Sequence, residues 1–167
     1  MRKYTTGLSA SGFRTLAKEI RKYRNGLQEK CEEFAKRLCE EGMECTKIIL
    51  SQHKDSRQTL ESLHLEDYSL GNKAYMCIVV ESEAILFLEF GAGIKYSHTQ
   101  NPKASELGYG AGTYPGKGHW DDPDGWYYIK DGKWHHTFGT EASMPMYNTS
   151  VEMRDKVQRI ANEVFSS

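Results

Sequence analysis

The chain has 167 residues, of which 22 are basic and 23 acidic, and hydrophobic residues make up 38% of it. This is an ordinary globular composition, and the length favours one domain whose core needs neither disulfides nor a structural metal. The balanced charge argues against a protein that wraps nucleic acid, and no apolar run approaches the ~20 residues that cross a bilayer. The first six residues lack the apolar segment of a signal peptide, so we expect the protein to stay in the cytoplasm.

The N-terminal part of the chain has the pattern of a long amphipathic helix. Apolar residues recur at steps of three and four over about 27 residues, so one face should pack on a sheet or another helix. Ser11 is the expected N-cap, Gly42 the expected stop, and Asn25-Gly26 a point where the helix could divide. Residues 46–50 could end this helix or begin a strand. Residues 1–40 carry ten basic and five acidic side chains; they could face phosphate or an acidic neighbouring subunit, although a solvated face is the simpler interpretation.

The middle of the chain predicts a small sheet followed by a short helix. Residues 60–65 have the pattern of a turn that enters a strand. Gly71-Asn72 is a hairpin-turn signal, and a buried strand is expected at residues 74–80. Residues 83–90 predict a short helix that runs up to a Gly-Ala-Gly segment.

Residues 91–140 differ from the rest of the chain. They hold ten of the 15 glycines, nine of the 19 aromatic residues and all three tryptophans, but only three branched aliphatic residues. Asp131-Gly132 is a type I′ turn dipeptide and predicts a hairpin near residues 125–138. A second amphipathic helix follows Pro145. We therefore expect a single α+β domain over residues 1–167, in which a long N-terminal and a C-terminal helix pack on a small, mainly antiparallel sheet, with a Gly/aromatic-rich insertion.

Patterns for catalysis or metal binding are weak in this sequence. The glycine run at residues 108–118 contains Lys117, but a phosphate-binding loop needs Ser or Thr directly after its Gly-Lys. Six side chains could in principle form a metal site or a hydrolase centre: His119, Asp121, Asp122, Asp124, His135 and His136. The last two are neighbours on a strand and point to opposite faces. The four cysteines have no metal-ligand spacing and are expected in the core. We predict no catalytic residue, no metal and no cofactor.

The aromatic hairpin allows a second interpretation. Residues 126–128 and 132–134 look like half of a choline-binding cell-wall repeat, in which aromatic rings cage a quaternary ammonium group. Such modules work as tandem arrays, and one copy cannot build the cage between repeats. A hairpin packed on its own body or on a neighbouring subunit is therefore favoured. The alternative is a phage accessory protein that binds cell-wall glycan or choline through Trp126, Tyr128 and Trp134.

Two short motifs flank the aromatic segment. The first is Leu-Glu-Phe-Gly-Ala-Gly at residues 88–93, and the second is Met-Pro-Met-Tyr at residues 144–147, where the last helix opens. Together with the long basic helix, this order resembles the small head–tail joining (tail completion, or neck) proteins of long-tailed bacteriophages and prophages. The first motif matches that family's Glu-Phe-Gly-Thr/Ala segment well, and the second matches its helix entrance less strictly. Residues 56–60 lack the glycine that the family often shows before its central strands.

The resemblance implies a non-enzymatic structural protein that acts in virion assembly at the head–tail junction. It implies that the protein assembles with copies of itself into a ring of six. It also implies contacts with connector proteins on the portal side and with the tail tube or tail terminator. The protein would be made in the host bacterial cytoplasm and end in the virion, with neither membrane nor sequence-specific nucleic acid as a partner. Because Trp, Tyr and Met are enriched in interfaces, the aromatic segment is the expected contact surface. The expected interface residues are Glu89, Phe90, Tyr109, Tyr114, Trp120, Trp126, Tyr128 and Trp134.

Overall fold

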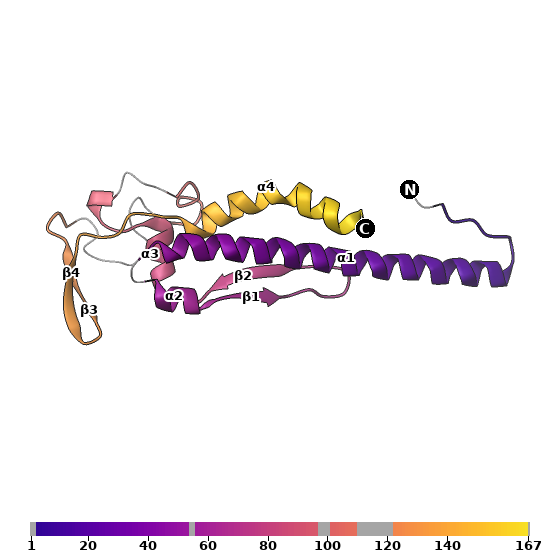
Figure 1. Ribbon diagram of the computed structural model, residues 1–167, viewed down its shortest axis with the longest axis horizontal. Coiled ribbons are helices and arrows are strands. Elements are labelled where there is room, and N and C mark those ends of the chain that lie inside the picture. Colours follow the sequence, from indigo (N-terminus) through magenta and orange to yellow (C-terminus); the bar gives the residue numbers. More distant parts are fainter. Residues whose placement is uncertain (1–2, 54–55, 97–100, 110–121, 167) are drawn as a thin grey trace.

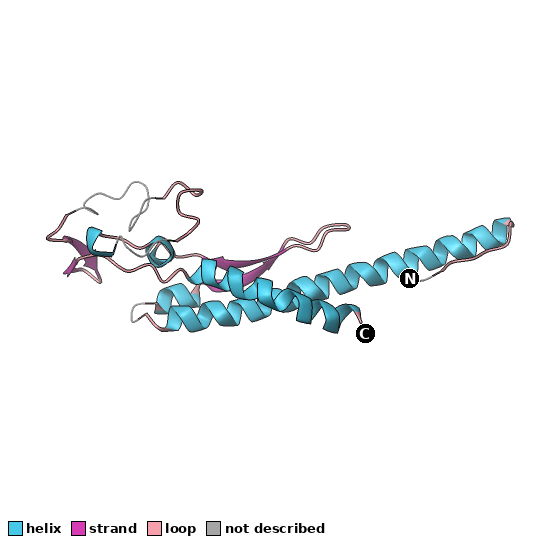
Figure 2. Ribbon diagram, turned by 90° about the horizontal axis from the view of Figure 1, so that it is seen from above, coloured by secondary structure: helices cyan, strands magenta, loops and turns pink. Residues whose placement is uncertain are grey.

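The protein has the α+β fold that the sequence predicts. A computed structural model describes it over residues 3–53, 56–96, 101–109 and 122–166. Helix α1 (Ala10–Ser51) runs through the molecule, with α4 (Pro145–Phe165) along one side of its C-terminal half and a β-hairpin along the other (Figure 1). The N-terminal half of α1 continues beyond both of these neighbours (Figure 2). Within the described ranges, no helix is long and apolar enough to cross a membrane.

Helix α1 begins earlier than expected and does not divide. Its N-cap is Ser9 and not Ser11, because the Ser9 side chain accepts a hydrogen bond from the Gly12 amide at 3.0 Å. The helix passes without a break through Asn25-Gly26. An interior glycine costs a helix about 1 kcal/mol relative to alanine, which the Lys, Arg, Glu and Gln residues around it offset.

The predicted stop at Gly42 is also wrong, for a reason that lies in the tertiary structure. A side chain at Gly42 would meet the Met153 sulfur at 2.5 Å and the Ile78 Cδ1 atom at 2.7 Å. The glycine therefore allows close packing between α1, α4 and the sheet, and the helix continues to Ser51. Residues 46–50 accordingly form the last turns of α1 and not a strand.

The core lies between α1 and α4. Leu50 of α1 and Ile160 of α4 are fully buried, and the buried hydroxyl groups of Thr46 and Thr149 hydrogen-bond to each other at 2.8 Å. Of the four cysteines, all free thiols, Cys39 is buried and the other three are half-buried.

The β1–β2 hairpin covers the opposite side of α1. After the short helix α2 (Arg57–Glu61), strand β1 (Leu63–Asp67) pairs antiparallel with β2 (Met76–Val80), and the turn lies at Gly71 as predicted. Leu65 stands opposite Ile78. Because Ile78 reaches Gly42 of α1, this alternate set of side chains faces the helix.

The remaining elements lie near the C-terminal end of α1 (Figure 1). Helix α3 (Ala84–Phe90) and the 3₁₀ turn η1 (Ile94–Tyr96) precede a second, separate hairpin of β3 (Trp126–Lys130) and β4 (Lys133–Thr137). Asp131 and Gly132 have φ angles of 52° and 72°, as the predicted type I′ turn requires. This hairpin stands out from the helical body (Figure 1).

Candidate functional site

The buried carboxylate of Glu89 joins α3 to the start of α4. It accepts hydrogen bonds from the Met146 amide at 2.8 Å, the Tyr147 amide at 2.9 Å and the Asn101 side-chain amide at 2.7 Å. The α4 N-cap residue, Met144, has no side-chain acceptor of its own, so Glu89 satisfies amides that the helix start leaves unpaired. The two motifs at residues 88–93 and 144–147 thus meet in one structural unit.

Burial sets the electrostatics of this junction. Only 8% of Glu89 is exposed, and this burial raises the pKa of its carboxyl, although the three N–H donors offset part of the rise. The neighbouring Phe90 is buried and stacks on Tyr109, with ring centroids 3.9 Å apart. Among the expected interface residues, Glu89 and Phe90 therefore make contacts within their own chain.

Two glycines bring the ends of the aromatic segment together. Ala92 and Thr140 exchange both backbone hydrogen bonds, at 2.8 and 2.9 Å. Beside them, Gly139 has a φ of 106°, and a side chain there would lie 1.9 Å from the Ala92 carbonyl oxygen. Gly93, with a φ of 88°, would similarly meet the Phe138 carbonyl at 2.3 Å. The aromatic segment therefore begins and ends at neighbouring positions of the body. Only glycine allows the two backbone segments to approach so closely at these φ angles.

The register of the second hairpin gives it two different faces. Trp126 and Tyr128 lie on one face, where Tyr128 stacks on His135 at 5.5 Å. The opposite face, which we call the hairpin apolar face, consists of five side chains: Tyr127, Ile129, Trp134, His136 and Phe138. All five are exposed, so this aromatic surface is uncovered within the described chain.

Contacts near the base of the β3–β4 hairpin fix the position of the hairpin apolar face. The His136 ring lies 4.8 Å from both the Tyr127 and Phe138 rings, and its Nε2 atom is 2.8 Å from the Asp124 carbonyl oxygen. The Lys95 ammonium group from η1 sits 3.3 Å above the centre of the Phe138 ring. Towards the tip, 61% of Ile129 and 70% of Trp134 are exposed.

The structure separates the three aromatic residues of the glycan-binding alternative. Trp126 and Tyr128 share a face, but Trp134 pairs with Ile129 on the opposite one. A strand directs successive side chains to opposite faces, so these three rings cannot form one platform on this hairpin.

Four of the predicted candidates are not among the described residues. Tyr114 and Trp120 of the expected interface lie outside the described residues, as do His119 and Asp121 of the weighed metal or hydrolase site. In the described parts of the chain, no group of three His, Cys, Asp or Glu side chains is placed to hold a metal ion.

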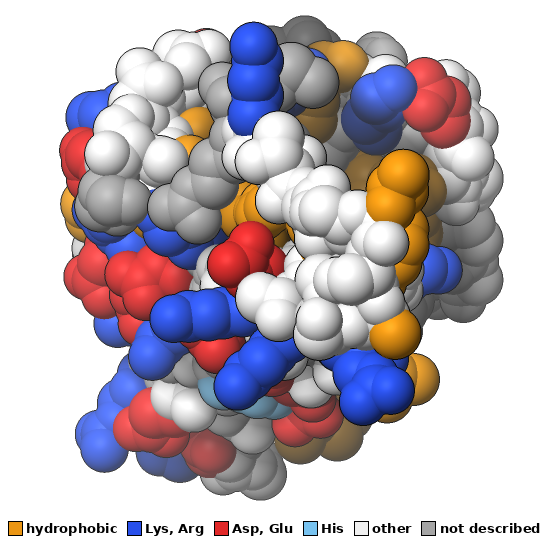
Figure 3. Space-filling model, turned by 90° about the vertical axis from the view of Figure 1, so that its right-hand side faces the viewer, with side chains coloured by type: hydrophobic (Ala, Val, Ile, Leu, Met, Phe, Trp, Pro, Cys, Tyr) orange, Lys and Arg blue, Asp and Glu red, His pale blue; other side chains and the backbone are white. Residues whose placement is uncertain are grey.

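A second exposed surface lies at the opposite end of the molecule, where the sequence predicts a packed helix face. We call residues 10–30 of α1 the helical arm. Its apolar stripe includes Phe13, Ile20 and Leu27, all exposed, and no strand or helix of the described chain covers them (Figure 1, Figure 2). The basic excess of the N-terminal region is the sequence signal for this second surface. Lys and Arg side chains stand out when the molecule is viewed from that end (Figure 3).

Comparison of the chain with protein-family models, with curated proteins and with solved structures found no match.

Proposed function

We propose that this protein is a non-enzymatic structural subunit of a bacteriophage or prophage, acting in virion assembly at the head–tail junction. In this role it forms a ring of identical copies, for which the resemblance implies six. The ring contacts the connector on the portal side and the tail tube or tail terminator. The subunit is made in the host bacterial cytoplasm and ends in the virion.

The observation that carries this proposal is the hairpin apolar face at one end of the subunit. Its exposed tyrosine and tryptophan are residue types enriched at interfaces, and a contiguous apolar surface of this kind marks an interaction site in monomeric proteins. The glycine junction and the Lys95–Phe138 contact hold the hairpin outward from the body. A subunit that joins two larger assemblies needs a contact surface that projects from its body and is held in a fixed position.

The α3–α4 junction is a second line of support. The two motifs that carry the resemblance are far apart in sequence, yet Glu89 of the first hydrogen-bonds to the Met146 and Tyr147 amides of the second. They therefore act as one structural unit, from which the aromatic segment extends.

A binding experiment with the full chain tests the proposal. Purified connector complex and tail tube from the phage or prophage that encodes the protein are mixed with the chain, and association is followed by sedimentation. We expect binding to one of these assemblies, weakened at least about tenfold by Ile129→Ser with Trp134→Ala, because central aromatic contacts dominate interfaces. The control is Tyr68→Ala, which removes an exposed ring from the other hairpin.

Two results would argue against the proposal. One is the absence of association with connector or tail tube, whether free or assembled. The other is retention on peptidoglycan or choline resin that is lost on Trp126→Ala, which would favour the glycan-binding alternative.

A further inference from the structure

The helical arm combines an exposed apolar stripe with a row of three arginines. At about 100° per residue, Arg14, Arg21 and Arg24 follow one border of the stripe formed by Phe13, Ile20 and Leu27. None of these three arginines has an ion-pair partner among the described residues. The arm as a whole carries six basic and two acidic side chains. It therefore suits a surface that is both apolar and acidic.

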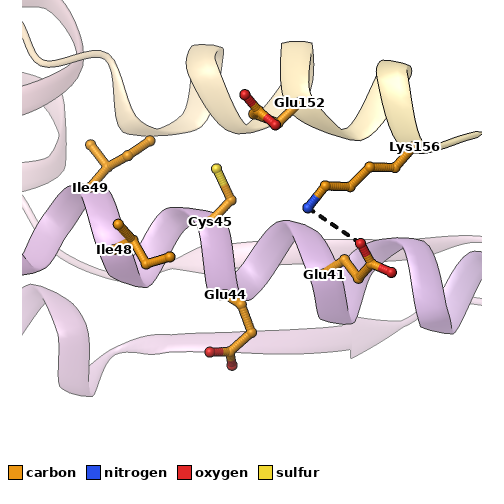
Figure 4. Close-up of a pocket in the computed structure, with 7 residues that line it drawn as sticks. All are labelled: Glu41, Glu44, Cys45, Ile48, Ile49, Glu152 and Lys156. Carbon is orange, nitrogen blue, oxygen red and sulfur yellow. Dashed lines mark ion pairs between the residues drawn. The ribbon is translucent and has the colours of Figure 1, made fainter.

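The chain carries such a surface in a groove between α1 and α4 (Figure 4). The groove is lined by the apolar Cys45, Ile48 and Ile49 and by Glu41, Glu44, Glu152 and Lys156. Cys45 points from α1 towards α4 (Figure 4), and 62% of Ile48 is exposed.

The carboxylates of this groove, which we call the acidic groove, differ in how far they are neutralised. Glu41 is paired with Arg159 and, at 3.3 Å, with Lys156. The hydrogen bond from Arg159 is the main cause that lowers the pKa of Glu41, and the one from Lys156 lowers it further. Glu44 pairs with Lys47 at 2.6 Å but remains largely exposed. Glu152 has no ion-pair partner in the described part of the chain. The charges of Glu41 and Glu44 are thus compensated by Arg159, Lys156 and Lys47. The uncompensated negative charge of Glu152 complements the arginines of the arm.

The arm cannot reach the acidic groove of its own chain. Both lie on α1, an uninterrupted helix, and the 28 residues from Ile20 to Ile48 span about 42 Å at 1.5 Å per residue. Folding the arm back would break the helix. The complementary surface must therefore belong to another molecule.

We propose that the helical arm of one copy docks in the acidic groove of a second copy, with stripe side chains against Cys45, Ile48 and Ile49 and the border arginines beside Glu152 of α4. Two arms packed against each other would instead bring like charges together. A second groove, lined by Cys31, Phe34 and Met76 among others, is apolar but has no carboxylate in its lining, so it leaves the arginines without partners.

This contact joins two different surfaces, so each copy that offers its arm still has a free groove. Such head-to-tail contacts generate a closed ring when the rotation between copies closes, and a filament otherwise. The inference rests on the proposed function in taking the assembly to be a ring. It assigns self-association to the arm and groove and leaves the hairpin apolar face for the larger partners.

Disulfide trapping tests the contact, because each groove contains native cysteines. Phe13→Cys, Ile20→Cys and Leu27→Cys are introduced singly into the full chain, treated with a mild oxidant, and analysed on non-reducing gels and by mass spectrometry. A disulfide requires the two Cα atoms to come within about 7 Å. We expect at least one of the three to form an intermolecular disulfide with Cys45, lost on Cys45→Ser. Lys22→Cys, on the opposite face of the arm, is the matched control and should not react with Cys45.

Charge reversal tests the electrostatic half of the contact. An arm variant with Arg21→Glu and Arg24→Glu, and a groove variant with Glu152→Arg, should each lower the yield of the Cys45 disulfide about tenfold when the partner surface is unchanged. Mixing the reversed arm with the reversed groove should restore the yield.

Every other result overturns this inference. Disulfides to Cys31 or Cys39 would place the arm in the second groove, arm-to-arm disulfides would pair two arms, and the absence of any specific disulfide would leave the arm undocked. Failure here with intact connector binding rejects only the arm–groove contact. A Cys45 disulfide in a protein that binds neither connector nor tail tube would instead reject the proposed function.

Discussion

Glu89 shows how one residue can link segments that are distant in sequence. Its carboxylate accepts three N–H donors from the start of α4 and from Asn101, and almost none of it is exposed. Leaving a buried N–H donor without an acceptor lowers the free energy of unfolding by about 1–3 kcal/mol. Glu89 therefore stabilises the fold of the chain.

Replacing Glu89 should destabilise the fold measurably. We expect Glu89→Ala to lower the free energy of unfolding by about 3 kcal/mol, because it leaves buried N–H groups without an acceptor. The measurement is urea denaturation followed by circular dichroism. Glu83→Gln, at an exposed glutamate beside the same helix, is the control and should change stability by less than about 0.5 kcal/mol. Equal stability of the two variants would contradict the role given to Glu89.

The raised pKa of Glu89 predicts the direction of a pH effect. The folded protein binds a proton at Glu89 at a higher pH than the unfolded chain does. Its contribution is therefore complete below the ordinary glutamate pKa and is lost as the pH rises through the raised value. The stability of the wild type relative to Glu89→Gln, whose side chain does not titrate, should increase as the pH falls from 7 to the ordinary glutamate value of 4.5. Urea denaturation at both pH values measures this difference. A decrease on acidification would mean that the N–H donors dominate the pKa.

At the scale of elements, the close approach of Gly93 and Gly139 determines where the aromatic hairpin points. Gly139→Ala should cost about 2 kcal/mol or more, because a side chain at a φ of 106° is strained and would collide with the Ala92 carbonyl. A lone two-stranded hairpin is marginally stable, so amides of β3 and β4 should lose protection from hydrogen exchange while those of α1 and α4 keep it. Gly71→Ala, with positive φ but open space, is the control. Unchanged protection of β3 and β4 in Gly139→Ala would contradict this account.

Elements with strong local signals were predictable from the sequence. The type I′ dipeptide predicted the second hairpin, Pro145 the start of α4, and Gly71-Asn72 the first turn, because each signal depends on backbone geometry within a few residues. The bounds of α1 were not predictable in this way. Gly42 is a stop signal locally, yet its contacts with Met153 and Ile78 make it an interior packing position.

The candidate surfaces were predictable only in part. Aromatic composition pointed to the hairpin, but the separation of Trp134 from Trp126 follows from strand register. The role of Glu89 depends on amides 57 and 58 residues away, which no local pattern reveals. The stripe through Phe13, Ile20 and Leu27 has the periodicity of a helix face packed in a core, yet these side chains are exposed. Periodicity shows that a helix has an apolar face but not whether the same chain covers that face.

At the scale of the whole molecule, the chain exposes more surface than a compact monomer of its mass would expose. Its accessible surface is 11700 Å², whereas a compact monomer of 19.1 kDa would expose about 8,400 Å². The arm and the hairpin lie at opposite ends (Figure 1), so a neighbour could cover one without obstructing the other.

The most direct test of the proposed role is the position of the protein in the particle. Virions of the phage or induced prophage that encodes the chain would be purified, labelled with an antibody against it, and imaged by electron microscopy. We predict label at the junction between head and tail, and particles lacking the protein that have unjoined heads and tails. Absence of the chain from purified virions, or label only at the capsid or the tail tip, would contradict the proposed function.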